Sequence, residues 1–208
     1  MGTVHIRSCL HCTKITKNKG EQNLKKKLTI LLIGLFSLIC ISLIFKPQNM
    51  ILKKIYKIEY SKYVYKYAEE NGINPYLIFA IIKNESNFKQ SIDSHMGAIG
   101  LMQLMESTAK EMANEIGEEV VVKEALYNPE TNIKIGTKYF AYLKKHYKGN
   151  ESLAIAAYNA GIGNVDNWIK EGIIKENGSD LENIPYKETN NHVRKILRDY
   201  RIYQKLYE

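Results

Sequence analysis

The amino-acid sequence predicts a mainly α-helical protein. Apolar residues recur at intervals of three and four positions along most of the chain after residue 60, as they do on the buried faces of helices. Glycines and prolines divide these runs into segments of ordinary helix length, and a strand-like pattern occurs only at residues 120–122. A chain of 208 residues is long enough for one domain with a substantial core and an additional segment.

The chain begins with a basic tail, residues 1–27. This tail holds seven lysine or arginine residues and one glutamate, while the formal net charge of the whole chain is +8. Most of the positive charge therefore lies in the tail, and we expect no nucleic-acid partner for the rest. The first 24 residues lack apolar periodicity, so we expect them to have no fold of their own. Cys9 and Cys12 have metal-ligand spacing, but one pair is half of a zinc site, and we expect it to play no structural role.

Residues 28–45 are predicted to be a single transmembrane helix. The eighteen residues carry no charge, and as a helix they would extend about 27 Å, close to a hydrocarbon core of about 30 Å. A cleaved signal peptide is the alternative, but the run is long and no small-residue cleavage site follows it. A lipoprotein signal ending at Cys40 is disfavoured because Ile39 is bulky. The lysines at 25–27 favour a cytoplasmic N-terminus, which would place the following domain outside the cell membrane.

A juxtamembrane linker is expected at residues 46–58, followed by one domain at residues 59–208. No cysteine follows Cys40, so the domain has no internal disulfide and must be stabilised by packing. Its first helix is predicted over residues 60–71, where Tyr63, Val64, Tyr67 and Ala68 share one side and Gly72 ends the helix.

The second predicted helix begins at Asn74 and carries Glu85 near its end. Asn74 can cap the helix, and Pro75 suits its first turn. Glu85 continues the apolar stripe of Ile78 and Ile81, where a charged group is seldom found without a reason. Apolar surroundings and the negative end of the helix dipole both disfavour the ionised carboxylate, which suits a proton donor. The alternative is a solvated glutamate at a frayed helix end.

The rest of the domain is predicted to be helical, with two interruptions. Residues 118–128 look irregular, and residues 172–185 form a loop. Each expected helix shows an apolar stripe of helical spacing or, in the third, a run of alanines ended by a glycine. These helices cover residues 101–116, 132–147, 152–160, 164–169 and 189–206.

Five segments of the domain, taken together, resemble a known family. They are AIIKNESNF, GAIGLMQLMEST, NPETNIKIGTKYF, AYNAGIGNV and IPYKETNNHVRKIL, in this order. They resemble the lytic transglycosylases of the soluble (SLT) type over roughly residues 61–206. The resemblance implies a lysozyme-like fold, an enzyme that needs no cofactor, and cleavage of peptidoglycan between N-acetylmuramic acid and N-acetylglucosamine.

The resemblance also implies a mechanism with one acid. The counterpart of Glu85 in the family protonates the glycosidic oxygen, then acts as a base while the muramic acid 6-hydroxyl closes onto C1 as a 1,6-anhydro ring. Glycosidases usually need two carboxylates. Asp93 and Glu106 are candidates for a second one, but neither lies in a pattern that indicates burial, and Glu106 stands where the family usually has proline.

Residues that would bind the glycan follow from the same segments. Gly97 and Ala98, with Gly100, would let the backbone approach the sugars closely, although a plain turn is the alternative. Two departures from the family, Ile162 for proline and His192 for an aromatic residue, affect the framework more than the chemistry. The remaining candidates that the resemblance implies are Ser86, Met102, Gln103, Tyr158, Asn159, Tyr186 and Glu188.

Three alternative functions remain open. A hydrolase of the same fold, like goose-type lysozyme, would give a reducing end instead of an anhydro end. A membrane-tethered, non-catalytic glycan-binding module would keep the fold without the chemistry. A basic nucleic-acid binder fits the uneven charge poorly. No metal, nucleotide or serine-hydrolase motif is present, so we expect no metal or cofactor. Expected partners are peptidoglycan, the membrane and, in some roles, cell-wall or secretion machinery.

Overall fold

The structure is a computed structural model of the chain and is mainly helical. It describes residues 6–45, 47–117 and 123–208, with side chains for residues 21–42, 49–117 and 123–208. In this part of the chain the only β-structure is two isolated bridges within residues 93–104, so the prediction of a mainly helical protein is confirmed. The strand-like pattern at residues 120–122 and the side chains of Cys9 and Cys12 lie outside the described residues.

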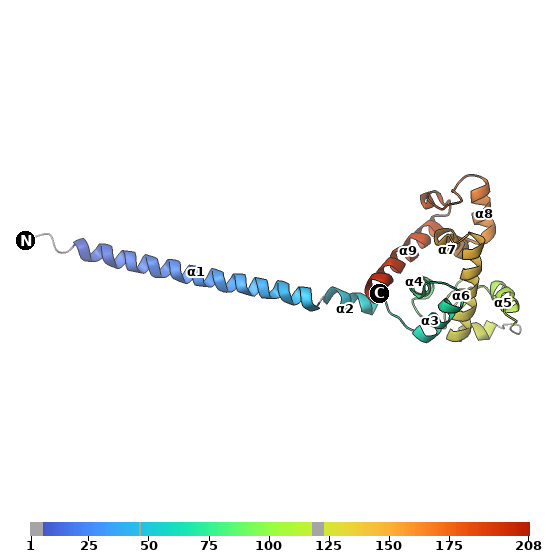
Figure 1. The fold of residues 1–208 in the computed structure, drawn as a ribbon, viewed down its shortest axis with the longest axis horizontal. Helices are drawn as coiled ribbons and strands as arrows, with labels where there is room; N and C mark the ends of the chain where they lie inside the picture. The colour runs from blue at the N-terminus through green and yellow to red at the C-terminus, as the bar shows by residue number, and fades with distance from the viewer. Residues whose placement is uncertain (1–5, 46, 118–122) are drawn as a thin grey trace, which may run out of the picture. The chain divides into compact units, whose positions relative to one another are not determined.

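The chain divides into two compact units, Met1–Leu52 and Lys53–Glu208. The first contains the long helix α1 (Ile6–Phe45) and most of α2 (Pro47–Ile55) (Figure 1). Residues 6–24, for which no fold of their own was expected, lie in α1. Helix α2 covers residues 47–55 of the predicted linker.

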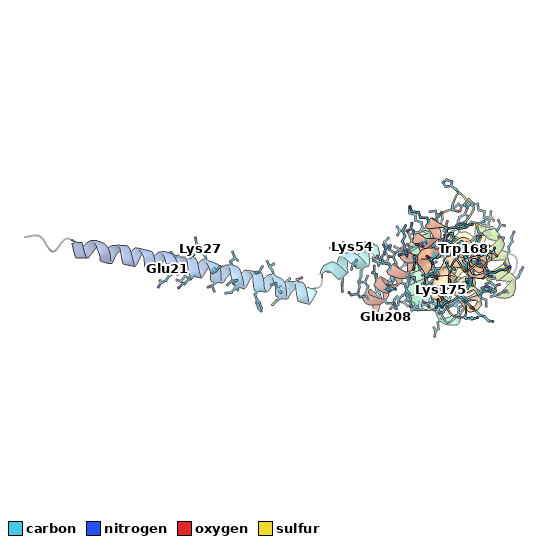
Figure 2. The ribbon with its side chains drawn as sticks, turned by 90° about the horizontal axis from the view of Figure 1, so that it is seen from above. Glu21, Lys27, Lys54, Trp168, Lys175 and Glu208 are labelled. Carbon is cyan, nitrogen blue, oxygen red and sulfur yellow. The ribbon has the colours of Figure 1, made fainter. Side chains whose placement is uncertain are left out.

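The apolar side chains of α1 are largely exposed. Leu28, Leu31 and Phe36 are 57%, 65% and 69% exposed, and the described side chains project from the helix on several sides (Figure 2). Within the described residues, no helix combines the length and apolar character needed to cross a membrane. The span predicted at residues 28–45 ends beyond Ser42, the last residue of α1 whose side chain is described.

The second unit is a cluster of helices around α4. The helices are α3 (Ser61–Glu70), α4 (Pro75–Glu85), α5 (Glu106–Glu115), α6 (Pro129–His146), α7 (Glu151–Ala160), α8 (Ile162–Lys170) and α9 (Lys187–Tyr207), with short 3₁₀ turns at Lys123–Tyr127 and Leu181–Asn183. Helix α4 packs against α9 and α3, while α7 packs against both α6 and α9 (Figure 1). Every residue from Leu77 to Ile82 is buried, so α4 is the centre of the core.

The ends of this unit are joined by tyrosine hydroxyls. Tyr203 donates to the Lys57 carbonyl at 2.9 Å, and Tyr207 donates to the Tyr56 carbonyl at 2.7 Å. Tyr76 at the start of α4 donates to the Tyr207 carbonyl at 2.8 Å. The last helix is therefore bonded both to the segment that precedes α3 and to the helix that carries Glu85.

Most predicted helices are present with boundaries shifted by a few residues, but one prediction is wrong. The helix expected over residues 101–116 begins at Glu106. Residues 99–104 instead form a tight turn, in which Ile99 and Leu104 exchange backbone hydrogen bonds of 2.9 and 3.0 Å. Side-chain periodicity does not reveal such a turn, because its residues are as apolar as those of a buried helix.

Candidate active site

Glu85 occupies the last position of α4. The helix starts as expected, with the Asn74 side chain accepting a hydrogen bond from the Tyr76 amide at 2.9 Å and Pro75 in the first turn. The Glu85 side chain is 13% exposed. A carboxyl that is mostly buried yet reachable by solvent is suited to exchange a proton with a bound substrate.

The last turn of α4 is held by a carboxylate that the sequence analysis missed. Asp199 of α9 has no exposed surface, and it accepts a hydrogen bond from the Asn84 amide at 3.0 Å and one from the Tyr56 hydroxyl at 3.1 Å. Lys83 Nζ lies 3.3 Å from it, and Arg198 donates from Nε at 2.9 Å. The two residues directly before Glu85 are thus fixed to α9. No local signal in the sequence relates Asp199 to α4.

The pKa of Asp199 is lowered by these partners. Burial alone would raise it, but the hydrogen bond from Arg198, the charge of Lys83 and the hydrogen bond from Asn84 outweigh the effect of burial. Asp199 is therefore an ionised group with a structural position and is not a second catalytic acid.

His192 of α9 lies directly against Glu85. Its Nε2 atom is 3.0 Å from Glu85 Oε1, and its side chain is 14% exposed. The distance is that of a contact pair, but the ring is not oriented for a hydrogen bond, so Nε2 is a buried nitrogen without a hydrogen-bond partner among the described residues. His192 was predicted to affect mainly the framework, whereas the structure places it against Glu85.

Ser86 and the loop that follows lie close to Glu85. The Ser86 hydroxyl donates to the Leu101 carbonyl at 2.8 Å, and the residue is buried. Ser86, which was predicted to contact the glycan, thereby ties the end of α4 to the turn at residues 99–104. In the same loop, the Ser94 hydroxyl accepts from the Ala98 amide at 3.0 Å, and Gly97 is exposed with a φ of 83°.

Gly100 is required by a close approach within this turn. Its φ is 76°, and a Cβ there would lie 2.6 Å from the Leu126 carbonyl oxygen. The neighbouring Asn132 donates to both the Leu126 and Ile99 carbonyls, at 2.8 and 3.0 Å, and accepts from the Met102 amide at 2.8 Å. The glycine therefore admits the Asn132 side chain, which holds the turn in place.

Met102 and Gln103 have different positions. The Met102 side chain is fully buried and packs against Gly136 of α6. Gln103 is partly exposed, has a positive φ of 46°, and donates from Nε2 to the Gly100 and Ile92 carbonyls at 2.9 and 3.1 Å. Its amide is thereby oriented by the turn itself.

Tyr158 of α7 reaches the same turn from the other side. Its hydroxyl donates to the Met102 carbonyl at 2.6 Å, and neither Glu85 nor Glu188 is the acceptor. Burial, and then the nearby charge of Glu85, raise the pKa of Tyr158 well above its ordinary value. Tyr158 is therefore a neutral hydrogen-bond donor close to Glu85, flanked by the Tyr139 ring at a centroid distance of 5.3 Å.

The remaining candidates lie at the ends of α7 and α9. The Asn159 side chain accepts from the Thr189 hydroxyl at 2.7 Å, which joins the two helices. The Tyr186 ring is 50% exposed and packs edge-on against Trp168 at 5.1 Å. Glu188 is exposed in the first turn of α9. Of these three, Tyr186 presents the largest surface on which a sugar can stack.

Neither candidate for a second carboxylate is free to act with Glu85. Asp93 accepts from Lys123 at 2.9 Å and from Tyr127 at 2.8 Å, and these hydrogen bonds lower its pKa. Glu106 pairs with Lys110 at 2.7 Å, which lowers the pKa of Glu106. Within the described residues no group of three or more histidine, cysteine, aspartate or glutamate side chains is arranged to hold a metal ion.

A cavity of about 890 Å³ lies elsewhere in the unit, between the end of α6, α8 and the loop after it. His146, Asp166 and Lys175 contribute to its lining, and it includes none of the candidate residues. We place the site at Glu85 because the acid, His192 and the Tyr158 hydroxyl converge there. In this arrangement the Glu85 carboxyl can both donate and accept a proton, and the hydrogen bonds around it hold it in a fixed position.

Comparison with known proteins identifies the family. Residues 62–178, more than half of the chain, match the family model described as the transglycosylase SLT domain. The chain is 32% identical to the soluble lytic murein transglycosylase of Salmonella typhimurium over 148 residues, 70% of this chain and 23% of that protein. It is 34% identical to the membrane-bound lytic murein transglycosylase C of Sodalis glossinidius over 128 residues, 56% of this chain and 35% of that protein.

A solved structure shows the same fold. The lytic transglycosylase Slt of Pseudomonas aeruginosa, in an inactive mutant form, matches with a TM-score of 0.65 and 34% identity, covering 73% of this chain and 25% of that one. The chain therefore spans about a quarter of the length of its soluble relatives. Both the family match and the shared mainly helical, lysozyme-like architecture show that the chain belongs to the transglycosylase SLT domain family.

Proposed function

We propose that the chain is a lytic transglycosylase that cleaves the bond between N-acetylmuramic acid and N-acetylglucosamine in peptidoglycan and leaves a 1,6-anhydro end. Membership of the SLT family gives the class of reaction. The observation that carries the proposal is the position of Glu85, a largely buried carboxyl at the end of a core helix whose last turn is fixed to α9. Asp93 and Glu106, the other acids considered, are each paired with a lysine.

In the first step, protonated Glu85 donates its proton to the glycosidic oxygen. The bond between C1 and that oxygen breaks, and its electron pair stays on the oxygen. The Tyr158 hydroxyl is committed to the Met102 carbonyl, so it shapes the wall beside the acid and does not compete for the proton. Gln103 and Tyr186 are the partly or fully exposed side chains that we propose to contact the sugars, together with the backbone at Gly97 and Ala98 and the ends of α7 and α9 at Asn159 and Glu188.

In the second step, the Glu85 carboxylate takes the proton of the muramic acid 6-hydroxyl, and that oxygen bonds to C1. The nucleophile belongs to the substrate, so no second carboxylate and no positioned water are needed. Glu85 ends the cycle protonated, as it began. One acid in a fixed position is therefore sufficient for the whole reaction.

The test uses the full chain and purified cell wall. Glu85→Gln keeps the size of the side chain but cannot deliver a proton, so release of anhydro-muropeptides should fall by roughly 10² to 10⁴, toward the upper end because one residue serves both steps. Glu106→Gln, the same exchange at a surface ion pair, is the control and should keep the wild-type rate.

Mass spectrometry of the fragments completes this test. An anhydro product is lighter by one water than the product of a hydrolase. Fragments with reducing ends would replace the proposed reaction by that of a lysozyme-type muramidase. A Glu85→Gln chain as active as wild type would show that Glu85 is not the acid, and binding without cleavage by wild type would leave a glycan-binding module.

We further propose that residues 28–45 anchor the chain in the cell membrane, with the basic tail of residues 1–27 inside and the domain at residues 59–208 outside, joined by residues 46–58. What supports this is the uncharged run of eighteen residues after three consecutive lysines. A relative is named as a membrane-bound transglycosylase, which is consistent with such an arrangement. Peptidoglycan lies on the outer side of that membrane, where the domain would meet its substrate.

A further inference from the structure

The imidazole of His192 has an unusual environment for a framework residue. It lies in the second turn of α9, and its Nε2 atom is 3.0 Å from Glu85 Oε1. That nitrogen has no exposed surface and makes no hydrogen bond within the described residues. A buried polar atom without a partner is unfavourable, and Glu85 Oε1 is the acceptor within reach. A hydrocarbon side chain would fill the same space, so packing alone does not require an imidazole here.

The other charged groups around this pair are directed elsewhere. From α4, Lys83 pairs with Asp199. From α7, the Tyr158 hydroxyl donates to the Met102 carbonyl. On α9 itself, Glu188 and Lys195 are exposed on either side of His192 along the helix. Among the described ion pairs, His192 is the partner of Glu85.

We infer that His192 is a positioning residue for Glu85 that donates a hydrogen bond from Nε2 to the carboxylate formed when Glu85 gives up its proton. This inference rests on the proposed function. Before the reaction, Glu85 is a neutral carboxyl and the misaligned ring forms only a contact. As the proton moves to the glycosidic oxygen, negative charge grows on Oε1 and a small ring rotation aligns the Nε2–H group with it. His192 keeps its own proton throughout, so the proton balance of the reaction is unchanged.

The hydrogen bond from His192 should stabilise the transition state and not the bound substrate complex, because Glu85 is not yet a carboxylate in that complex. Its loss should therefore lower turnover and leave KM nearly unchanged. A charge-assisted hydrogen bond is stronger than a neutral one, and a protonated ring should stabilise the carboxylate more than a neutral donor can. A residue that only packs would show neither signature.

The experiment compares His192→Phe and His192→Gln in the full chain with wild type, using purified glycan strands. His192→Phe removes the donor, and turnover should fall about tenfold or more while KM changes less than about twofold. His192→Gln keeps an N–H donor, so it should retain much of the turnover that His192→Phe loses. His146→Gln, which removes an imidazole paired with Asp166 in the other cavity, should leave turnover unchanged.

A measurement without turnover guards against variants that fail to fold. In full chains carrying ¹³C-labelled histidine, Glu85→Gln should change the chemical shifts of the His192 ring signals, because the exchange alters the group in contact with Nε2. Unchanged ring signals would show that the two side chains do not interact. A wild-type chain that cleaves no glycan overturns the proposed function, whereas an active chain that is indifferent to His192→Phe overturns only this inference.

Discussion

At the scale of single residues, two hydroxyls hold the turn that lies beside the acid. Ser86 donates to the Leu101 carbonyl at 2.8 Å, and Tyr158 donates to the next carbonyl, that of Met102, at 2.6 Å. The first comes from the end of α4 and the second from α7, so the backbone at residues 101–102 is held from both helices. The turn is thereby fixed to the two elements nearest Glu85.

Tyr158 contributes a hydrogen bond and no proton transfer. Burial and the charge of Glu85 keep its pKa well above the ordinary value, so its hydroxyl stays protonated at any pH at which the protein would work. The hydroxyl can therefore keep donating to the Met102 carbonyl. Replacing the hydroxyl of Tyr158 tests how the turn at residues 99–104 is held, and it leaves Glu85 itself unchanged.

Tyr158→Phe should fold but should lose activity. Removing the hydroxyl leaves the Met102 carbonyl without this partner, which should cost about 1 to 3 kcal/mol of stability. Turnover should fall by roughly tenfold to a hundredfold, because a turn displaced by even a fraction of an ångström misplaces the substrate. Thermal unfolding and wall digestion measure the two effects. Tyr142→Phe, at an exposed tyrosine of α6, is the control, and equal rates for both variants would remove Tyr158 from the site.

At the scale of elements, the pairing of α4 with α9 decides where the acid lies. Asp199 bonds Asn84 in the last turn of α4 and Tyr56 in the segment before α3, and it also pairs with Lys83. A helix end would otherwise fray, since its last carbonyls lack intrahelical donors. Here three elements share one carboxylate, and Glu85 follows directly after the fixed residues.

Asp199→Asn should destabilise the unit, with a defined dependence on pH. Removing the buried charge leaves Lys83 and Arg198 without their partner and should cost about 3 kcal/mol at neutral pH. The folded pKa of Asp199 lies below its unfolded value of about 3.9, so its contribution is present above about pH 4 and is lost as the pH falls through the folded pKa. The wild type should therefore lose stability in acid more steeply than the variant.

Chemical denaturation at several pH values measures this difference. Asp93→Asn, at an exposed pair with Lys123, is the matched control and should change stability little. Parallel acid dependence in wild type and Asp199→Asn would show that the carboxylate contributes nothing through its charge.

Sequence reasoning predicted the helices well where the signal is local. Asn74 and Pro75 mark the start of α4 by chemistry that depends on adjacent residues, and the structure has the cap as predicted. It failed at residues 101–105, where the backbone is held by Asn132 from a distant part of the chain. It also missed Asp199 and underestimated His192, because their partners lie on another helix and are brought near only by folding.

The candidate site was predictable to a similar extent. Helical spacing predicted that Glu85 lies on an apolar face, and its side chain is mostly buried in the structure. Its role as the acid came from the family resemblance and stays a prediction. The burial of Ser86 and Met102 depends on how the turn packs against α4 and α6, so the local sequence pattern does not reveal it. Hydrophobic periodicity predicts on which face of a helix a residue lies. It does not predict which other part of the chain packs over that face.

At the scale of the whole molecule, the helical unit and α1 pose different physical problems. The unit from Lys53 onward buries its apolar residues, whereas the described apolar side chains of α1 are mostly more than half exposed. Exposed apolar surface of that extent is unfavourable in water, so these side chains would be more stable in an apolar environment. We propose that a lipid bilayer is this environment for the uncharged run at residues 28–45.

The full chain should accordingly remain with membranes after washing with alkaline carbonate. Protease added outside wall-stripped cells should remove the domain, because we propose that it faces outward. Placing two charged residues in the apolar run, as in Leu35→Lys with Leu38→Glu, should release the chain from membranes, whereas Lys14→Ala with Lys17→Ala in the tail should not. Mature protein that begins after residue 45 in the medium would show that the segment is a cleaved signal.

The shared carboxylate of Asp199 also affects how the molecule opens. Because the end of α4, the middle of α9 and the backbone near Tyr56 are bonded to one another, none of them can separate alone without breaking bonds that hold the others. Hydrogen exchange of their amides should then proceed through a single opening event with one common free energy, despite their wide separation in the sequence. Thermal motion that separates α9 from its partners would therefore also displace Glu85. Opening of the last helix and loss of the catalytically productive position of Glu85 would occur together.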